Sequence, residues 1–288
     1  MKRPPWHPRV TAMVPSYNGE AFIQRTLDSL AAQTWDNLEI LIADDCSTDR
    51  TPEIVAEFAR THRNVRLLPR AENLGWLRNS NDLMANATGE LVFFAFHDDV
   101  VHPRYVTLLV RALRRRPDAI MAYSDLKLHY PTGRRVVGRL ETLPRRRTAI
   151  GRGLVMIARP RFWGAPNRGL FRRAAFARIG GIQPNAAGDF SADWPWLLHM
   201  ALLGNFVRVP RVLVWKYYQK TSKTMLWSRN AANKRAMWQS AYREVWRADV
   251  PLRDRLAVIA YGALRLDALR RRLPRGLKAR IARLFGVR

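Results

Sequence analysis

Apolar runs and segments of helical periodicity alternate along the first third of the chain. Strand predictions rest on short apolar runs of β-branched and aromatic residues, and helix predictions on apolar side chains spaced three and four positions apart. We expect strands at residues 10–14, 38–43, 65–68 and 90–96, and helices at 21–30, at 75–87 and after a start formed by Thr51 (N-cap) and Pro52 (first helical position). Strands that alternate with helices at this spacing predict an α/β fold with a mostly parallel sheet flanked by helices.

The last fifth of the chain has a different pattern. Residues 231–247 and 252–273 carry apolar residues among arginines, and the residues after Pro274 predict a short basic helix with one apolar face. Such amphipathic helices suit an anionic membrane surface, but they suit equally a position packed on the main domain with the basic face in solvent. The pattern leaves both positions open.

Composition indicates a folded protein in a reducing compartment. Of its 288 residues 48% are hydrophobic, which is ample for a core, and the single cysteine, Cys46, excludes an intramolecular disulfide and a thiolate zinc cluster. Residues 1–10 lack the apolar core of a signal peptide. No stretch approaches the roughly 18 apolar residues of a membrane-spanning helix. We expect a cytoplasmic protein that is neither exported by that route nor integral to a membrane.

The formal net charge of +27, most of it from arginine, implies an anionic partner. Nucleic acid, an acidic membrane surface and a phosphorylated substrate all meet that requirement, and an arginine-rich proteome would account for much of the excess without any partner. Nucleic acid is the least favoured, because the basic residues are spread along the chain rather than interleaved with a stacking platform, and the acidic strand ends would repel a polyanion. We expect no nucleic-acid partner.

Polar clusters follow three of the predicted strands, at residues 16–19, 44–49 and 97–99. Ligands of open α/β sheets bind beyond the carboxyl ends of the strands, so these clusters predict one shared site. The first turn lacks the glycine-rich fingerprints of dinucleotide and P-loop folds, which leaves acidic groups to recognise the ligand. Carboxylates accept hydrogen bonds from a base or ribose, and the pair Asp98 and Asp99 suits Mg²⁺ or Mn²⁺ with a diphosphate. Alone, Asp44, Asp45 and Asp49 could be turn and capping residues, and Asp98 and Asp99 a solvated loop pair. Together the clusters predict nucleotide-diphosphate binding.

In these segments the sequence resembles glycosyltransferase family 2, whose members have the GT-A fold, a Rossmann-like α/β fold of nucleotide-diphospho-sugar transferases. The resemblance is carried by residues 14–55 (VPSYNGEAFIQRTLDSLAAQTWDNLEILIADDCSTDRTPEIV) and 73–103 (NLGWLRNSNDLMANATGELVFFAFHDDVVHP), and it extends loosely to about Thr224. It implies a nucleotide-sugar donor, a divalent metal, and transfer to an acceptor hydroxyl with inversion at the anomeric carbon by a single in-line displacement.

The resemblance also divides the chain. It implies a GT-A catalytic domain over residues 1–227, with a nucleotide-binding half at 8–120 and an acceptor and catalytic-base half at 121–227, followed by a basic helical region at 228–288. The role it implies is bacterial cell-surface polysaccharide or glycolipid synthesis, with a saccharide or lipid-linked saccharide as acceptor. Peripheral attachment to the inner face of the cytoplasmic membrane through the helical region would suit such an acceptor.

The resemblance implies donor-binding roles for individual residues of this chain. Pro15, Tyr17 and Asn18 match the strand-end segment that looks onto the base and ribose. Asp45 matches the aspartate that contacts the base or ribose, and Arg78 matches a basic residue near the nucleotide. A cation is reasonable there, because two donor phosphates need more neutralisation than one metal supplies.

The metal motif of the family often reads Asp-x-Asp-Asp, and counting back from Pro103 puts Phe96 at its first position. The chain departs from the family there, and only Asp98 and Asp99 remain. We expect Asp98 to bind the metal, and Asp99 to contact the ribose or the metal. His97 is a further candidate ligand, although a lone histidine beside a strand end is more often structural.

An inverting transferase needs a general base for the acceptor hydroxyl. Residues 188–197 resemble the family's Glu-Asp segment at the start of a helix, which puts Asp193 at the catalytic position and Ala192 in place of the usual Glu. Asp193 could instead cap the helix ahead of Pro195. Asp189 is the fallback base if the alignment slips by a few residues.

Residues 150–181, between the metal motif and the predicted base, resemble the family segment that forms the donor-sugar and acceptor pocket. We expect Trp163, Asn167 and Trp194 to line this pocket, although the aromatic residues could equally belong to the core. Residues 215–224 resemble a mobile segment that closes over the diphosphate in related enzymes. Lys220 and Lys223 are the expected phosphate contacts there.

Two departures from the family pattern, Phe96 and Ala192, keep a second function open: a catalytically inactive GT-A-like protein that binds a nucleotide sugar or a partner. A structure with the Asp193 carboxylate far from the pocket bounded by Asp45 and Asp98 would favour it. A nucleotidyltransferase is disfavoured, because no glycine- and lysine-rich triphosphate loop lies near the first strand.

Overall fold

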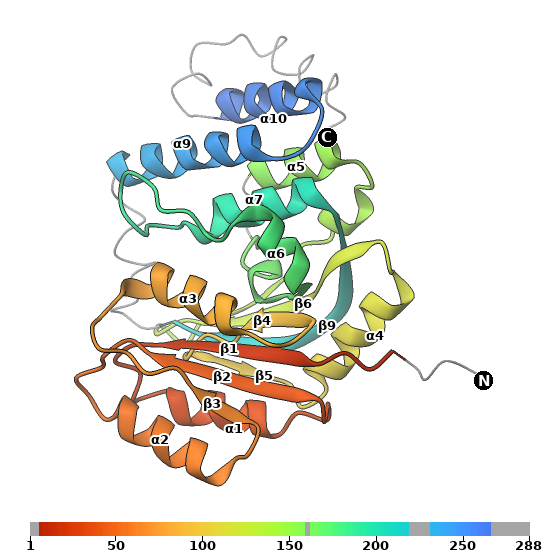
Figure 1. Cartoon of the computed structure of the whole chain (residues 1–288). Coiled ribbons are helices and arrows are strands. Elements are labelled where there is room, and N and C mark those ends of the chain that lie inside the picture. The colour runs from red at the N-terminus through yellow and green to blue at the C-terminus, as the bar shows by residue number, and fades with distance from the viewer. Residues whose placement is uncertain (1–5, 159–161, 219–230, 266–288) are drawn as a thin grey trace.

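The computed structural model of the chain describes residues 6–158, 162–218 and 231–265. One mixed sheet runs through it, with helices on both faces (Figure 1), and its main strand order is β3-β2-β1-β4-β8-β6-β9-β5, with β7 paired to β6. The strands are β1 (Val10–Ser16), β2 (Leu38–Asp44), β3 (Val65–Leu67), β4 (Leu91–Phe94), β5 (Asp99–Val101), β6 (Ala119–His129), β7 (Arg135–Gly138), β8 (Leu170–Arg172) and β9 (Asn205–Tyr217). The helices are α1 (Ile23–Ala31), α2 (Thr51–Thr61), α3 (Gly75–Asn86), α4 (Tyr105–Arg115), α5 (Ala149–Ile157), α6 (Arg173–Ile179), α7 (Asp193–Leu203), α9 (Ala231–Arg247) and α10 (Leu252–Arg265).

The first four strands form the parallel part of the sheet that the sequence predicts. β1 pairs in parallel with β2 and with β4, and β2 pairs in parallel with β3. Every residue of β1 is buried, because α1 and α2 cover one face of this part of the sheet and α3 covers the other (Figure 1). The predicted strands and helices of this region are confirmed, with ends that differ by one or two residues.

The start of α2 differs from the predicted one. Thr51 lies inside the helix, and its hydroxyl donates to the carboxylate of Asp49 and accepts from the backbone N–H of Gly19. The N-cap position is held by Arg50, with no side-chain capping bond, and the carboxylate of Asp49 accepts the backbone N–H of Thr51 at 2.9 Å. The predicted N-cap at Thr51 is wrong by one residue, since the helix already begins at Thr51.

Strands from the second half of the chain extend the same sheet. β8 pairs antiparallel with β4 and β6, and β9 runs parallel to β6. β5 pairs antiparallel with the end of β9, and in this register Asp99 lies opposite Lys216. The acidic strand end therefore meets residues from far along the chain.

The C-terminal helices stack on the helices of the main domain (Figure 1): α9 packs on α7, and α10 on α5. Between α7 and α9, His199 Nδ1 and Glu244 Oε2 lie 2.9 Å apart and both side chains are buried. This is the packed arrangement that the sequence pattern left open. The short basic helix expected after Pro274 lies outside the described residues. Among the helices that the structure describes, none combines the length and apolar content that crossing a bilayer requires.

Candidate active site

The carboxyl ends of β1 and β2 are held together by hydrogen bonds between their loops. Ser16 donates its hydroxyl to Asp44 at 3.1 Å, and the backbone N–H of Asn18 donates to Ser47 at 2.8 Å. Tyr17, which lies between Ser16 and Asn18 in the chain, has 41% of its surface exposed. The predicted donor-binding segment of β1 thus lies directly beside the polar loop of β2.

Asp45 joins the end of β2 to the start of α3. Its side chain is buried, and its Oδ1 accepts the backbone N–H of Leu74 at 2.7 Å. Arg78, on the first turns of α3, is exposed. Asp189 reaches the same place, since a Cβ added to Gly75 would lie 3.3 Å from its Oδ2. Asp45, Arg78 and the fallback residue Asp189 are therefore gathered around the N-terminus of α3.

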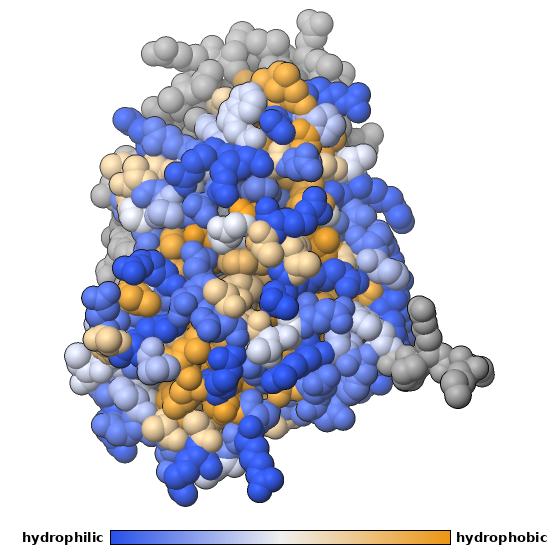
Figure 2. All heavy atoms as spheres, in the orientation of Figure 1, coloured by the Kyte–Doolittle hydropathy of each residue, from blue (hydrophilic) through white to orange (hydrophobic). Residues whose placement is uncertain are grey.

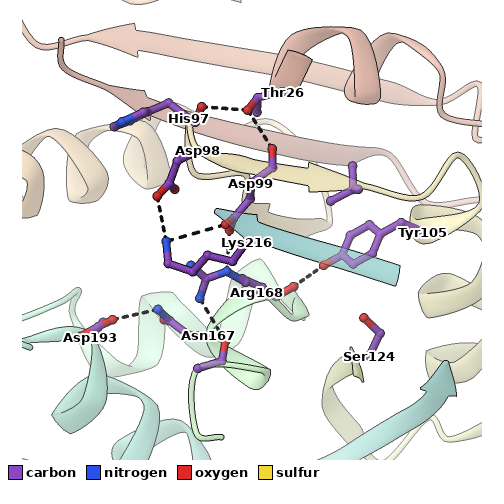
Figure 3. Close-up of polar contacts among 12 residues, drawn as sticks. Thr26, His97, Asp98, Asp99, Tyr105, Ser124, Asn167, Arg168, Asp193 and Lys216 are labelled. Carbon is purple, nitrogen blue, oxygen red and sulfur yellow. Dashed lines mark hydrogen bonds and ion pairs between the residues drawn. The ribbon is translucent and has the colours of Figure 1, made fainter. Parts of the chain in front are cut away.

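Asp98 precedes and Asp99 begins β5, which pairs with β9. Each of the two carboxylates is paired with a cation (Figure 3). Lys216 Nζ lies 2.9 Å from Asp98 Oδ2 and 3.8 Å from Asp99 Oδ1. Arg168 Nε lies 2.5 Å from Asp99 Oδ2. The side chain of Asp98 is 16% exposed and that of Asp99 only 3%. The predictions from sequence assigned neither cation, although a lone lysine within the apolar end of β9 is a signal that could have found Lys216.

The turn that carries the pair is fixed from two sides. The hydroxyl of Thr26, on α1, lies 2.8 Å from the backbone oxygen of His97 and 2.7 Å from that of Asp99. The ring Nδ1 of His97 lies 3.4 Å from the backbone oxygen of Pro15. Both contacts join the acidic turn to the β1 side of the site.

The two carboxylates differ in their pKa values. Burial raises the pKa of Asp99 above its ordinary value, even with Arg168 and Lys216 beside it. Burial also opposes the ionisation of Asp98, but the charges of Lys216 and His97 outweigh it and hold the pKa of Asp98 below its ordinary value. Asp98 is therefore the member of the pair that is both ionised and reachable from solvent.

The residues of this pair fit a divalent cation on one condition. Asp99 Oδ1 is buried and has no hydrogen-bond partner among the described residues, and Lys216 Nζ lies 3.8 Å from it and 2.9 Å from Asp98 Oδ2. Oxygen ligands that converge on one point suit Mg²⁺ or Mn²⁺, provided that Lys216 leaves that point. In the described part of the chain no three His, Cys, Asp or Glu side chains form a metal cluster, so the donor and water would have to complete the coordination.

Asp193 begins α7, and Asn167 orients its carboxylate. Asn167 Nδ2 donates to Asp193 Oδ2 at 2.8 Å, and Asn167 is buried. The N-cap of α7 is Ala192, with no side-chain capping bond. Asn167 and Arg168 are consecutive in the short turn Pro166–Arg168, so this one turn binds both Asp193 and Asp99 (Figure 3). The predicted base is thereby connected to the predicted acidic pair.

The two tryptophans expected in the sugar pocket differ in how deeply they are buried. Trp163 is partly exposed. Trp194 is fully buried, its indole N–H donates to the backbone oxygen of Met156 at 3.1 Å, and its ring packs edge-on against Trp238 of α9. The prediction that Trp194 lines an open pocket is wrong, because α5 and α9 enclose it. Lys220 and Lys223 lie outside the described residues.

Comparison with known proteins identifies the family. The family model described as "Glycosyl transferase family 2" matches residues 11–179. The putative glycosyltransferase EpsH of Bacillus subtilis (strain 168) is 33% identical over 115 residues, which are 40% of this chain and 33% of EpsH. The chain thus matches about a third of the length of this curated relative.

Solved structures share the fold across most of the chain. S. aureus TarS 1-349 in complex with UDP-GlcNAc superposes with a TM-score of 0.69 at 19% identity, covering 89% of this chain and 72% of TarS 1-349. The mannosyltransferase PcManGT of Pyrobaculum calidifontis, in complex with GDP-Man and Mn²⁺, gives a TM-score of 0.60 at 21% identity, with 96% of this chain and 79% of PcManGT covered. These likenesses confirm the predicted GT-A architecture. Because the family model covers more than half of the sequence, the chain belongs to glycosyl transferase family 2.

Proposed function

We propose that the chain transfers a sugar from a nucleotide-diphosphate sugar to an acceptor hydroxyl, with inversion at the anomeric carbon. The observation that carries the proposal is the turn Pro166–Arg168, which binds Asp193 through Asn167 and Asp99 through Arg168. A group suited to remove a proton and a pair suited to hold a diphosphate are thereby fixed relative to each other, as an in-line displacement requires. A protein that only binds a nucleotide sugar would not need this connection.

The structural relatives support the donor class. Solved structures of TarS include complexes with UDP and UDP-GlcNAc, and that of PcManGT contains GDP-Man. In this chain we assign base and ribose contacts to Pro15, Tyr17, Asn18 and Asp45. Arg78, which is exposed on α3, is assigned to neutralise phosphate charge.

Asp193 is the proposed general base. Its carboxylate takes the proton of the acceptor hydroxyl while the hydroxyl oxygen attacks the anomeric carbon and the nucleoside diphosphate leaves from the opposite face. Asn167 fixes the orientation of that carboxylate through its 2.8 Å hydrogen bond. Asp189 stays the alternative base, beside the N-terminus of α3.

The proposed metal ligand is Asp98, with Asp99 behind it. A divalent ion held there would neutralise charge on the leaving diphosphate, and the Mn²⁺ in the PcManGT complex supports this assignment. Asp99 remains in its buried ion pair with Arg168 and keeps the strand end in place.

The proposed acceptor is a saccharide or lipid-linked saccharide of bacterial cell-surface polysaccharide or glycolipid synthesis, met at the inner face of the cytoplasmic membrane. The C-terminal helices support a peripheral contact. Trp246, Leu252 and Leu256 are 49%, 57% and 50% exposed, and the side chain of Arg253 beside them is 87% exposed. Figure 2 shows hydrophobic and hydrophilic residues side by side at the α10 end of the molecule. Such a mixture suits the interface of an anionic bilayer.

A thermal-shift screen of UDP-, GDP- and dTDP-sugars, each with and without Mn²⁺, tests the donor proposal. We expect one nucleotide class to raise the Tm, because a ligand that binds only the folded chain stabilises it. If no nucleotide sugar raises the Tm under any metal condition, the donor proposal fails, and the inactive partner-binding protein is the remaining alternative.

A further inference from the structure

Lys216 already occupies the cation position of the acidic pair. Its ammonium lies 2.9 Å from Asp98 and 3.8 Å from the Asp99 oxygen that has no hydrogen-bond partner among the described residues. The pairing of β5 with β9 puts Lys216 opposite Asp99 in register, so the backbone sets this position. The ammonium also lies over the ring of Tyr218, 5.1 Å from its centroid.

The local charges are balanced without any ligand. Arg168 compensates Asp99 and Lys216 compensates Asp98, and only 14% of the Lys216 side chain is exposed. A divalent ion that approached Asp98 would be repelled by the ammonium bound to the same carboxylate. A donor diphosphate would be repelled by Asp98 but attracted by Lys216, provided that the lysine were released from the carboxylate.

We propose that Lys216 is a switching counter-ion, bound to Asp98 in the donor-free protein and transferred to the donor diphosphate when a divalent ion takes its place at Asp98. The inference rests on the proposed function and adds a residue and an order of events to it. Neither ligand alone favours displacement of Lys216. The ion alone would leave the ammonium of Lys216 without an anion, and the diphosphate alone would leave the carboxylate of Asp98 without a cation. The two ligands are therefore expected to bind with positive coupling.

Titration of the full chain with Mn²⁺, followed through the electron paramagnetic resonance signal of the free ion, tests the inference without any measurement of turnover. Without nucleotide, the wild-type protein should bind Mn²⁺ weakly, and Lys216→Met should bind it at least about fivefold more tightly, the lower end of typical couplings. Lys216→Arg keeps the cation and should remain as weak as the wild type. Lys234→Met removes the same charge from an exposed position on α9 and should change nothing.

The same titration with UDP or GDP present separates the inference from the proposed function. The nucleotide should tighten Mn²⁺ binding in the wild type, and should do so much less in Lys216→Met. Equal nucleotide-free affinities of wild type and Lys216→Met, or no Mn²⁺ binding by this variant, would overturn the switching role. Failure of both nucleotides to affect Mn²⁺ binding in every variant would instead count against the donor proposal. Lys216→Gln replaces Lys216→Met if the melting curve of the latter shows a loss of folding.

Discussion

Asn167 donates a hydrogen bond to Asp193 over 2.8 Å, from a turn whose next residue, Arg168, is bound to the acidic strand end. A displacement of this turn would therefore move the proposed base and the proposed diphosphate site together. The proposed base and the proposed diphosphate site both depend on this turn, and the role of each residue can be tested by a single substitution.

Asp193→Asn should abolish transfer and leave donor binding intact. The amide keeps the size of the side chain but cannot take the proton, a step that contributes about 10² to 10⁴-fold to rates. Turnover and donor affinity, measured on the same preparation, check this. Asp189→Asn is the matched control, and the assignment is reversed if that variant loses turnover while Asp193→Asn keeps it.

Asn167→Ala should lower kcat by about tenfold or more with a smaller change in KM for the donor, because the buried amide is bound to Asp193 and acts by orienting the base. Steady-state kinetics separate the two constants. Asn64→Ala removes a comparable side-chain hydrogen bond, to the backbone of Leu38, far along the sheet. A loss of kcat of the same size in both variants would mean that Asn167 acts only through stability.

Arg168→Met should lower the free energy of unfolding by about 3–5 kcal/mol, because it leaves the buried carboxylate of Asp99 without its cation. The double variant Arg168→Met/Asp99→Asn should lose less. Urea denaturation measures both. The exposed pair of Arg60 with Glu57 provides a control, since solvent screens such a pair and Arg60→Met should leave the free energy of unfolding nearly unchanged. Equal losses in the single and double variants would show that the ion pair is not the reason for the effect.

Leu256→Asp should weaken binding to vesicles that contain phosphatidylglycerol, because it puts a negative charge into the exposed apolar residues of α10. Flotation of the full chain with such vesicles, and with vesicles of phosphatidylcholine alone, gives the measurement. Leu67→Asp makes the same change at a residue that is 38% exposed on β3, and should bind like the wild type. No binding of the wild type to either vesicle would refute the membrane contact.

The sequence predicted the parallel strands and the acidic strand ends, because those features are local: an apolar run, a polar cluster and a helical period. It did not predict the partners of the acidic pair. Lys216 lies 118 positions from Asp98 along the chain, and Arg168 lies 69 positions from Asp99. Only the antiparallel entry of β8 and β5 into the sheet brings these residues together. The prediction that Trp194 lines the pocket was wrong for a related reason. Trp194 is covered by Trp238 of α9, a long-range contact that the residues around Trp194 do not reveal.

The most direct test of the donor site is isothermal titration calorimetry of the nucleotide sugar selected by the thermal-shift screen, with Mn²⁺ present, against the wild type and Asp98→Ala. The wild type should bind the donor, chelation of the metal should weaken that binding, and Asp98→Ala should lose the metal-dependent part. Donor binding that is identical in Asp98→Ala and in the wild type, with and without metal, would contradict the assignment of the acidic strand end to the donor diphosphate.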